Sequence, residues 1–382
     1  MRNSSPTRLC ASRRSALHAQ FESRATVSDV RRSLTRDVRA GSDTLDDAFS
    51  RSSDVAIPRQ IIDTRRMLAL TIDREVRLRT DYPEPKPKRG EAVLDVRLAG
   101  ICDTDLQICR GYHEFSGVMG HEFVGQVRSA TASELQGKRV VCDINGGCGT
   151  CAECRAFGGH HCANRGVVGI VGRDGAFAER IAVPEPNLVV VPDEVTDEQA
   201  VFAEPLAAAL HVLDVVTPGA NTLVLGDGKL GLLIAFAMKG AGQQVLLAGH
   251  HHRKLSIAEG VGIETCLEQQ LSDQRFDAVV EATGSATGFE RALGLVRPKG
   301  TLVLKTTVAD RIAVDLSALV VNEIQLVGSR CGDLGRAVEF MRRERIDLSE
   351  LIAERHALRD GVEAIRRAGE PGTLKVLLEP GR

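Results

Sequence analysis

Between residues 222 and 327 the chain alternates short apolar runs with longer stretches that have helical periodicity. Alternation of this kind is typical of a parallel sheet whose strands are joined by crossover helices. The expected strands and helices are Thr222–Leu225, Lys229–Gly240, Gln244–Ala248, Lys254–Gly260, Ala278–Glu281, Thr287–Leu295, Thr301–Leu304 and Gln325–Val327. The pattern therefore predicts an α/β domain with a doubly wound parallel sheet.

Residues 67 to about 193 have a different texture, with short, irregular apolar runs separated by turn residues. They predict a β-rich domain with strands at Met67–Ile72, Glu91–Ala99, Phe123–Val127, Arg139–Val141 and Asn187–Val191. Near the C-terminus we expect a helix at Leu334–Arg343 and a strand at Leu374–Leu377. A chain of 382 residues is long enough for two domains, each with its own core.

A glycine-rich turn joins the first strand of the α/β region to its first helix. It consists of Gly226, Asp227, Gly228, Lys229, Leu230 and Gly231. In a dinucleotide-binding turn of this spacing, the first glycine permits a tight turn, the second lets a pyrophosphate approach, and the third lets the helix pack closely. The helix N-terminus attracts the phosphates. The turn predicts a Rossmann domain that binds NAD(P), and a glycine-rich turn without a ligand is the alternative.

The coenzyme preference depends on the end of the second strand. A carboxylate is expected there, about 20 residues after the glycine turn, to hold the ribose hydroxyls of NAD. The sequence instead has Gly249, three histidines, Arg253 and Lys254, so the local charge is positive. We therefore expect NADP to be favoured over NAD, with Gly249 and Arg253 at the 2′-phosphate, and we expect Gly249→Asp to reverse the preference. A histidine or main-chain amide that holds the ribose of NAD is the alternative.

Four cysteines occur at the spacing C-x2-C-x2-C-x7-C, namely Cys148, Cys151, Cys154 and Cys162. Thiolates this close in sequence can converge on one ion, and four of them complete the tetrahedral shell of Zn2+. Because a complete shell leaves no position for substrate, this zinc is predicted to be structural. Four free thiols in a glycine-rich loop are the alternative, although free cysteines prefer buried apolar sites.

A second set of metal-ligating residue types comprises Cys102, His121 and Glu204, from separate parts of the chain. Thiolate, imidazole and carboxylate are the ligands of an open catalytic zinc site, which keeps a position for substrate. Zinc lowers the pKa of a bound alcohol, and the alkoxide can then release hydride to a nicotinamide. Taken alone, Cys102 would more often be a core thiol and His121 a core histidine.

In combination, these motifs resemble the zinc-dependent medium-chain dehydrogenase/reductase superfamily, and within it the alcohol, sorbitol and threonine dehydrogenase group. The resemblance runs from Met67 to near the C-terminus. It rests on G-I-C-D-T-D-L, G-H-E, the four-cysteine loop, E-P-L-A, G-D-G-K-L-G, E-A-T-G and G-S-R-C-G, in that order. It implies a GroES-like catalytic domain at residues 67–208, completed by residues 335–382, with a Rossmann domain at residues 209–334 between them.

The resemblance also implies roles around the catalytic metal. Cys102, His121 and Glu204 would bind the zinc. Glu122 would be either an exchangeable ligand or a carboxylate beside the metal. Asp105 would orient the ring of His121 by a hydrogen bond.

Further implied roles concern the proton and the coenzyme. Thr104 would hydrogen-bond the alcohol and pass on its proton, and Arg330 would reach a coenzyme phosphate. Many alcohol dehydrogenases have a histidine five residues after the zinc cysteine, at the end of the proton relay. Gln107 stands there in this chain. Because Gln107 cannot act as a base at neutral pH, the proton must leave by another route.

The predicted function is a zinc-dependent alcohol or polyol dehydrogenase, which transfers hydride reversibly between an alcohol, or its carbonyl, and NAD(P). A carbonyl reductase with the same site is one alternative, and a catalytically silent zinc-containing NAD(P)-binding protein is another. The expected partners are a small-molecule substrate and further copies of the chain, in a homodimer or homotetramer. Nucleic acid is not expected, because the chain lacks Trp and has a net charge of −2. A membrane is not expected either, because no apolar run approaches about 18 residues.

Residues 1–66 are rich in arginine and serine and contain no lysine. This composition is typical of an organelle transit peptide. A disordered tail, or translated sequence upstream of a start at Met67, is the alternative, and in each case the segment is expected to be dispensable for catalysis. The expected location is the cytoplasm, or a plastid or mitochondrion if the segment is a transit peptide.

Overall fold

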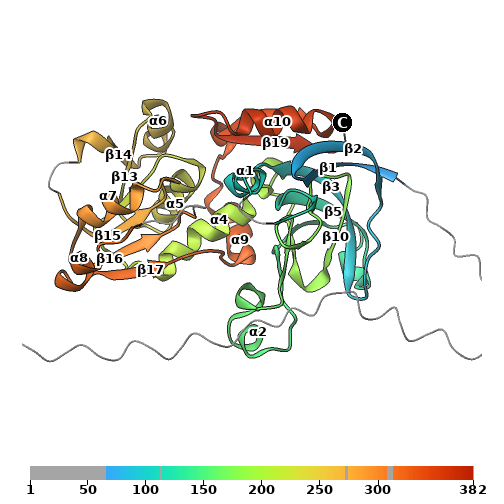
Figure 1. The fold of residues 1–382 in the computed structure, drawn as a ribbon, viewed down its shortest axis with the longest axis horizontal. Helices are drawn as coiled ribbons and strands as arrows, with labels where there is room; N and C mark the ends of the chain where they lie inside the picture. The colour runs from blue at the N-terminus through green and yellow to red at the C-terminus, as the bar shows by residue number, and fades with distance from the viewer. Residues whose placement is uncertain (1–65, 112–113, 272–273, 308–312, 382) are drawn as a thin grey trace, which may run out of the picture. The chain divides into compact units, whose positions relative to one another are not determined.

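The computed structural model describes residues 66–111, 114–271, 274–307 and 313–381. The interpretations of residues 1–65 therefore concern residues outside the described part and stay predictions, whereas Arg66, the last residue of the expected extension, begins β1. Figure 1 shows a β-rich region, which contains β1 and β3, and an α/β region, which contains β12 and α5. Among the described residues, no helix is long and apolar enough to cross a membrane.

The α/β region is built on a six-stranded sheet in the order β14-β13-β12-β15-β16-β17 (Figure 1). All of its strand pairings are parallel. The strands are β12 (Thr222–Leu225), β13 (Val245–Gly249), β14 (Glu264–Leu267), β15 (Phe276–Glu281), β16 (Val296–Leu304) and β17 (Gln325–Gly328). Because the first strand lies in the middle, the chain builds the sheet outward on one side and then on the other. This confirms the predicted Rossmann-type sheet.

Helices cover this sheet on both faces. They are α5 (Lys229–Gly240), α6 (His252–Gly260) and α7 (Gly288–Leu295), whereas the short helix α8 (Leu316–Val321), which precedes β17, has no buried residue. Successive side chains of a strand point to opposite faces. Accordingly, Leu223 and Leu225 share a buried cluster with Phe289 of α7, whereas Val224 shares a different cluster with Leu232 of α5. A strand buried on both faces requires an apolar run, and β12 has one.

The β-rich region contains a seven-stranded sheet in the order β11-β6-β5-β3-β19-β18, with β10 also paired to β3. A three-stranded sheet in the order β2-β1-β4 and a small sheet in the order β7-β8-β9 complete it. Its strands are β1 (Arg66–Asp73), β2 (Glu75–Pro83), β3 (Glu91–Gly100), β4 (Gly117–Val118), β5 (Glu122–Ser129), β6 (Arg139–Cys142), β7 (Asn145–Gly146), β8 (Gly166–Val168), β9 (Gly172–Arg173), β10 (Arg180–Pro184), β11 (Leu188–Val190), β18 (Ile352–Ala357) and β19 (Lys375–Glu379).

The C-terminal part of the chain returns to the β-rich sheet (Figure 1). Strand β19 pairs antiparallel with β3, so that Leu377 lies opposite Gly100 and Leu378 opposite Ala99. Helix α10 (Gly361–Ala368) packs its apolar face into the same core as β19. This arrangement brings residues near position 375 beside the segment that follows β3, where Cys102 lies.

The remaining helices lie in the connections between strands. They are α1 (Asp103–Cys109), α2 (Ala152–Phe157), α3 (Asp197–Ala200), α4 (Ala203–Leu210) and α9 (Leu334–Glu344). Short 3-10 turns occur at Ser133–Leu135, Gly159–His161, Glu185–Asn187, His211–Asp214, Glu268–Gln270, Ser349–Leu351 and Leu358–Asp360. Helix α4 is buried along most of its length and shares one apolar cluster with α5 and α9. It therefore holds the segment that contains Glu204 firmly in the core.

Candidate zinc and coenzyme site

The structure brings together a thiol, an imidazole and a carboxylate at the start of α1. The potential ligand atoms of Cys102, His121 and Glu122 all lie within 4.8 Å of one another. Cys102 immediately precedes α1, and His121 and Glu122 lie where the chain enters β5, the neighbour of β3. Because these donors are of the types that zinc prefers, the cluster fits a metal ion.

Asp105 is placed to hold this cluster in position. It lies in the first turn of α1 and is fully buried, and its Oδ2 accepts a hydrogen bond of 2.8 Å from the backbone N–H of Cys102. Its Oδ1 lies 3.3 Å from Nδ1 of His121. Burial alone would lower the pKa of His121, but the facing Asp105 and Cys102 raise it overall. The two atoms face each other as a buried ion pair without hydrogen-bond geometry, so Nδ1 is turned toward Asp105 and the other ring nitrogen is left for a metal.

Glu204 lies near the cluster but outside the group of atoms within 4.8 Å. It is in the first turn of α4, and its pKa is raised by burial while it also feels the charges of His121 and Glu122. Thr104 lies on α1 and is half-buried. The structure thus assembles Cys102, His121 and Glu122 tightly, with Glu204 as a further carboxylate close by.

Lys375 is a residue of this site that the sequence reading missed. It is the first residue of β19 and is buried, and its Nζ forms an ion pair with Oε2 of Glu122. The same Nζ lies 3.4 Å from the carbonyl oxygen of Ile101, next to Cys102. A buried lysine requires an anionic partner. A lysine inside a predicted apolar strand was the available signal, but it did not identify the partner.

The four cysteines of the loop between β7 and β8 also converge. The Sγ atoms of Cys148, Cys151, Cys154 and Cys162 lie within 4.8 Å of one another. The Cys148–Cys154 and Cys151–Cys162 sulfur pairs are each 3.9 Å apart. A tetrahedron with Zn–S bonds of about 2.3 Å has sulfur–sulfur edges of about 3.8 Å. The loop is therefore shaped for one zinc ion with four thiolate ligands.

The glycine-rich turn has the geometry that dinucleotide binding requires. Gly226 has a φ of 122°, which favours glycine. A Cβ atom at Gly231 would lie 1.9 Å from the carbonyl oxygen of Gly226, so only glycine lets α5 approach the turn. A Cβ atom at Gly228 would meet no described atom within 4 Å, so this part of the turn is open. The open part lies at the N-terminus of α5, where backbone N–H groups attract phosphate.

The carboxylate of Asp227, in the glycine-rich turn, lies at the end of the second strand, which was not predicted from the sequence. Its side chain is buried and lies against Gly249, the last residue of β13. Its Oδ2 accepts hydrogen bonds from the backbone N–H groups of His250 at 2.8 Å and His251 at 2.6 Å. The premise that no carboxylate lies at the end of the second strand therefore does not hold.

The other predicted coenzyme residues take varied positions. Nζ of Lys229, at the start of α5, lies 2.8 Å from Oδ1 of Asp103, so the glycine turn contacts the helix that follows Cys102. Leu230 is half-buried, and Arg253 is exposed on α6. The guanidinium of Arg330 donates to the carbonyl oxygen of His160 at 2.6 Å and to Oδ1 of Asn145 at 3.3 Å. Arg330 would have to leave these acceptors to reach a phosphate.

A second buried lysine lies behind Glu204. Nζ of Lys305, at the end of β16, lies 2.9 Å from the carbonyl oxygens of Ala208 in α4 and Arg330 after β17. Burial lowers the pKa of Lys305 to about 8. The amine ties α4 to the sheet and thereby supports the position of Glu204.

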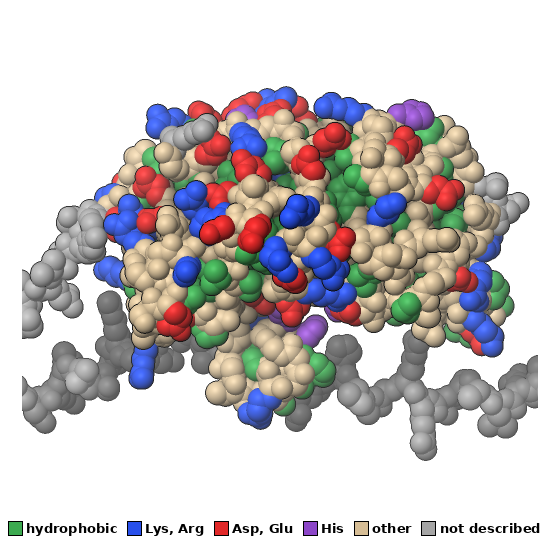
Figure 2. All heavy atoms as spheres, turned by 180° about the vertical axis from the view of Figure 1, so that it is seen from behind, with side chains coloured by type: hydrophobic (Ala, Val, Ile, Leu, Met, Phe, Trp, Pro, Cys, Tyr) green, Lys and Arg blue, Asp and Glu red, His purple; other side chains and the backbone are tan. Residues whose placement is uncertain are grey.

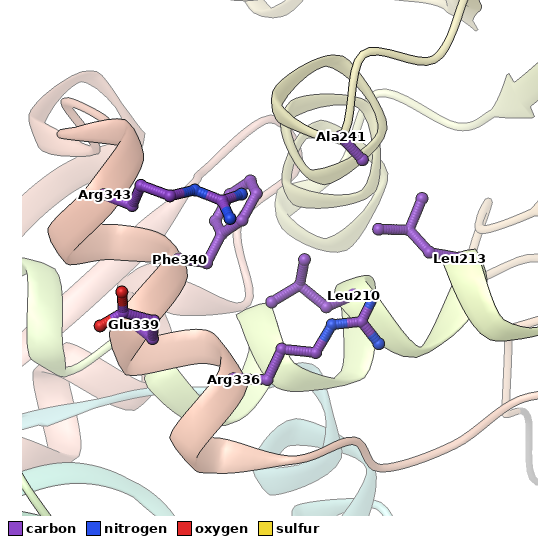
Figure 3. Close-up of a pocket in the computed structure, with 7 residues that line it drawn as sticks. All are labelled: Leu210, Leu213, Ala241, Arg336, Glu339, Phe340 and Arg343. Carbon is purple, nitrogen blue, oxygen red and sulfur yellow. The ribbon is translucent and has the colours of Figure 1, made fainter.

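Two surface features do not involve the predicted site residues. A small pocket of about 220 Å3 between α4, α5 and α9 is lined by Leu210, Leu213, Ala241, Arg336, Glu339, Phe340 and Arg343 (Figure 3). None of the predicted metal or coenzyme residues lines it. On the face shown in Figure 2, Lys and Arg side chains are interspersed with Asp and Glu, so this face carries no basic stripe.

Comparison with known families assigns the two regions. Residues 88–193 match the alcohol dehydrogenase GroES-like domain, and residues 229–347 match the zinc-binding dehydrogenase domain. An L-threonine 3-dehydrogenase from Chelativorans sp. (strain BNC1) is 30% identical over 76% of this chain and 92% of its own length. A D-altritol 5-dehydrogenase from Agrobacterium fabrum is 31% identical over 75% of this chain and 91% of its own length.

Solved structures with the same fold hold either coenzyme. A zinc-binding dehydrogenase from Sinorhizobium meliloti 1021, bound to NADP, is 26% identical with a TM-score of 0.76, over 83% of this chain and 100% of that chain. An alcohol dehydrogenase from E. coli CFT073, complexed with NADH, is 26% identical with a TM-score of 0.74, over 82% of this chain and 99% of that chain.

Fold, metal clusters and coenzyme turn together define a metal-dependent dinucleotide-linked oxidoreductase. The chain belongs to the zinc-binding medium-chain dehydrogenase family, as the motifs predicted. It is a zinc-dependent, NAD(P)-linked oxidoreductase that acts on CH–OH groups.

Proposed function

We propose that Cys102, His121 and Glu204 hold the catalytic zinc of an alcohol or polyol dehydrogenase. The observation that carries the proposal is the cluster of Cys102, His121 and Glu122, whose ligand atoms lie within 4.8 Å of one another. Glu122 is paired with Lys375, which supports a role as a carboxylate beside the metal that can exchange onto it. Glu204, from α4, would be the remaining carboxylate ligand.

The residues around this cluster supply positioning and proton transfer. When bound, zinc acts as a Lewis acid on the alcohol oxygen, which makes hydride transfer to the nicotinamide possible. Asp105 would hold the ring of His121 in place. Thr104, half-buried on α1, would accept a hydrogen bond from the alcohol and pass its proton to water, since Gln107 cannot serve as a base. The Lys229–Asp103 contact supports a coenzyme seated next to this cluster.

We propose a secondary alcohol of a polyol or of a hydroxy-amino acid as the substrate class. The support comes from similar proteins whose names are L-threonine 3-dehydrogenase and D-altritol 5-dehydrogenase. Zinc content of the purified protein, together with NAD(P)H formation on a panel of polyols and hydroxy-amino acids, tests the function. Full zinc content with neither alcohol oxidation nor carbonyl reduction would favour the silent binding protein instead.

Catalysis and coenzyme binding are proposed to lie in two different domains. Residues 67–208 and 335–382 would form the catalytic domain, and residues 209–334 would bind the coenzyme. The pairing of β19 with β3 supports the assignment of the C-terminal segment to the catalytic domain. NADP was expected because no carboxylate follows the second strand in sequence, but the Asp227 carboxylate lies against Gly249 at the end of that strand. Arg253 and Lys254 still place positive charge on α6. The choice between NAD and NADP therefore depends on Asp227.

We also propose that the chain self-associates through the α8–β17 patch, which comprises Leu316, Val320, Val321 and Leu326. Their exposed fractions are 67%, 75%, 79% and 42%. Strand β17 is at the edge of the described sheet, and an edge strand offers backbone groups for pairing with another chain. An exposed apolar patch beside a sheet edge supports a homodimer, which could assemble further into a homotetramer.

Charges placed in this patch should break the association. Replacing both Val320 and Val321 by Asp is expected to shift the protein toward monomers, because burial of each valine contributes about 1.5–3 kcal/mol. Size-exclusion chromatography with light scattering measures the mass. Val261→Asp, at an isolated valine that is 46% exposed, is the control and should leave the mass unchanged. An unchanged mass for the double variant would contradict the proposed interface.

A further inference from the structure

We propose that Asp227, in the glycine-rich turn, supplies the carboxylate that selects NAD over NADP. The inference rests on the proposed function, because it concerns the coenzyme of the same site. It reverses the preference expected from the sequence, which depended on the end of β13 alone.

The Asp227 side chain fills the place of a strand-end carboxylate. Gly249 ends β13, where a Rossmann domain specific for NAD has its ribose-binding acid. A Cβ atom at Gly249 would lie 2.4 Å from Cβ and Cγ of Asp227 and 2.5 Å from its Oδ2. A side chain from position 249 would therefore extend into space that Asp227 already occupies. The glycine at the strand end and the aspartate in the turn thus depend on each other.

The turn after β13 holds this carboxylate mainly through Oδ2, while the ring of His251 lies against both carboxylate oxygens. Oδ2 accepts the two backbone hydrogen bonds, from His250 at 2.8 Å and His251 at 2.6 Å. The imidazole Nδ1 of His251 lies 3.0 Å from Oδ2 and 3.1 Å from Oδ1. Because a carboxylate offers about four lone-pair sites, Oδ1 retains capacity for one more donor. That donor can be a ribose hydroxyl.

Charge makes this position selective. The ribose 2′-hydroxyl of NAD can donate a hydrogen bond to Oδ1 of Asp227. The 2′-phosphate of NADP carries negative charge, and its approach to a second anion is repulsive. The Asp227 side chain is only 7% exposed, so solvent screens its charge poorly. Arg253 is exposed on α6, and water and salt screen its attraction for a phosphate more strongly.

Direct binding of the reduced coenzymes tests the inference without any substrate. NADH and NADPH are titrated into the zinc-loaded protein, and the fluorescence of the reduced nicotinamide reports binding. The wild type should bind NADH at least about tenfold more tightly than NADPH, which corresponds to about 1.4 kcal/mol. In Asp227→Asn, the amide oxygen can still accept the hydrogen bonds from the backbone N–H groups of His250 and His251. The amide NH2 group takes the place of the second carboxylate oxygen, so the negative charge is lost. The preference should then move at least about tenfold toward NADPH.

Moving the carboxylate provides the second test. Gly249→Asp alone should weaken binding of both coenzymes, because its side chain overlaps Asp227. Combining it with Asp227→Gly places the acid on the strand end and should restore the preference for NADH. Glu268→Gln is the matched control, since Oε2 of Glu268 lies 3.0 Å from Nε2 of His250 in the same neighbourhood. The control should leave the NADH/NADPH affinity ratio unchanged.

Each outcome separates this inference from the proposed function. Tighter binding of NADPH than NADH by the wild type would overturn the role of Asp227, as would an unchanged ratio in Asp227→Asn. Absence of binding of either coenzyme to the folded, zinc-loaded wild type would contradict the proposed dehydrogenase function itself.

Discussion

Replacing Cys102 by Ser is expected to reduce kcat/KM for alcohol oxidation by about a thousandfold or more, while the melting temperature changes little. Lewis-acid stabilisation by a metal is worth several kcal/mol, and each tenfold in rate corresponds to about 1.36 kcal/mol. Cys102 is half-buried at the start of α1, so the substitution leaves the surrounding apolar core intact. Steady-state kinetics, zinc analysis and a thermal melt measure the three effects.

Controls on the same elements separate metal binding from packing. Cys109→Ser changes a half-buried thiol at the end of α1 that is outside the metal cluster, and it should keep both turnover and zinc. His121→Ala should lose turnover as Cys102→Ser does. Full turnover and full zinc content in Cys102→Ser would show that the catalytic zinc is bound elsewhere.

The local parts of the fold and site were predictable because neighbouring residues determine them. Strand β12 and helix α5 have the predicted ranges, Thr222–Leu225 and Lys229–Gly240. An apolar run, a glycine turn and a helical pattern follow one another there without interruption. The four-cysteine loop was predictable for the same reason, since all of its ligands lie within 15 consecutive residues.

The ion pair between Lys375 and Glu122 could not be predicted in this way. The two residues are 253 positions apart in sequence. Their contact depends on β3, which pairs with β19 on one side and with β5, the strand of Glu122, on the other. None of these strands specifies its neighbours by composition. A lysine within a buried strand indicates that an anion lies nearby, but only the topology shows which one.

The proposed role of Asp227 was not predicted from the sequence, because the ribose-binding acid is expected after the second strand and Asp227 follows the first. The sequence reading looked for an acid after β13 and found Gly249. However, β12 and β13 are parallel neighbours, with Leu225 opposite Ala248, so the turn after β12 lies beside the end of β13. Because these two strands end at the same edge of the sheet, a side chain from the turn after β12 can occupy the position of a side chain at the end of β13. An aspartate in the glycine turn, together with a glycine at the strand end, was the available signal.

Replacing Cys151 by Ser is expected to destabilise the protein rather than to affect catalysis directly. Helix α2, which begins after Cys151, has no buried residue, and Phe157 at its end is 69% exposed. With so little apolar packing, the four thiolates and their metal must hold this loop in place. Binding of a structural zinc contributes directly to folding free energy. A loss of about 4 kcal/mol would lower the melting temperature by roughly 10 °C.

Cys266→Ser provides the matched comparison, because Cys266 is a half-buried thiol on β14 that belongs to neither metal cluster. It should keep both zinc ions and the wild-type melting temperature. Cys151→Ser should lose the structural zinc and become cleavable by protease within residues 146–162, whereas turnover per folded molecule at low temperature should largely remain. The opposite pattern in Cys102→Ser would establish that one metal serves chemistry and the other serves the fold. Unchanged stability and zinc content in Cys151→Ser would contradict the structural assignment, because three remaining thiols leave the tetrahedral shell incomplete.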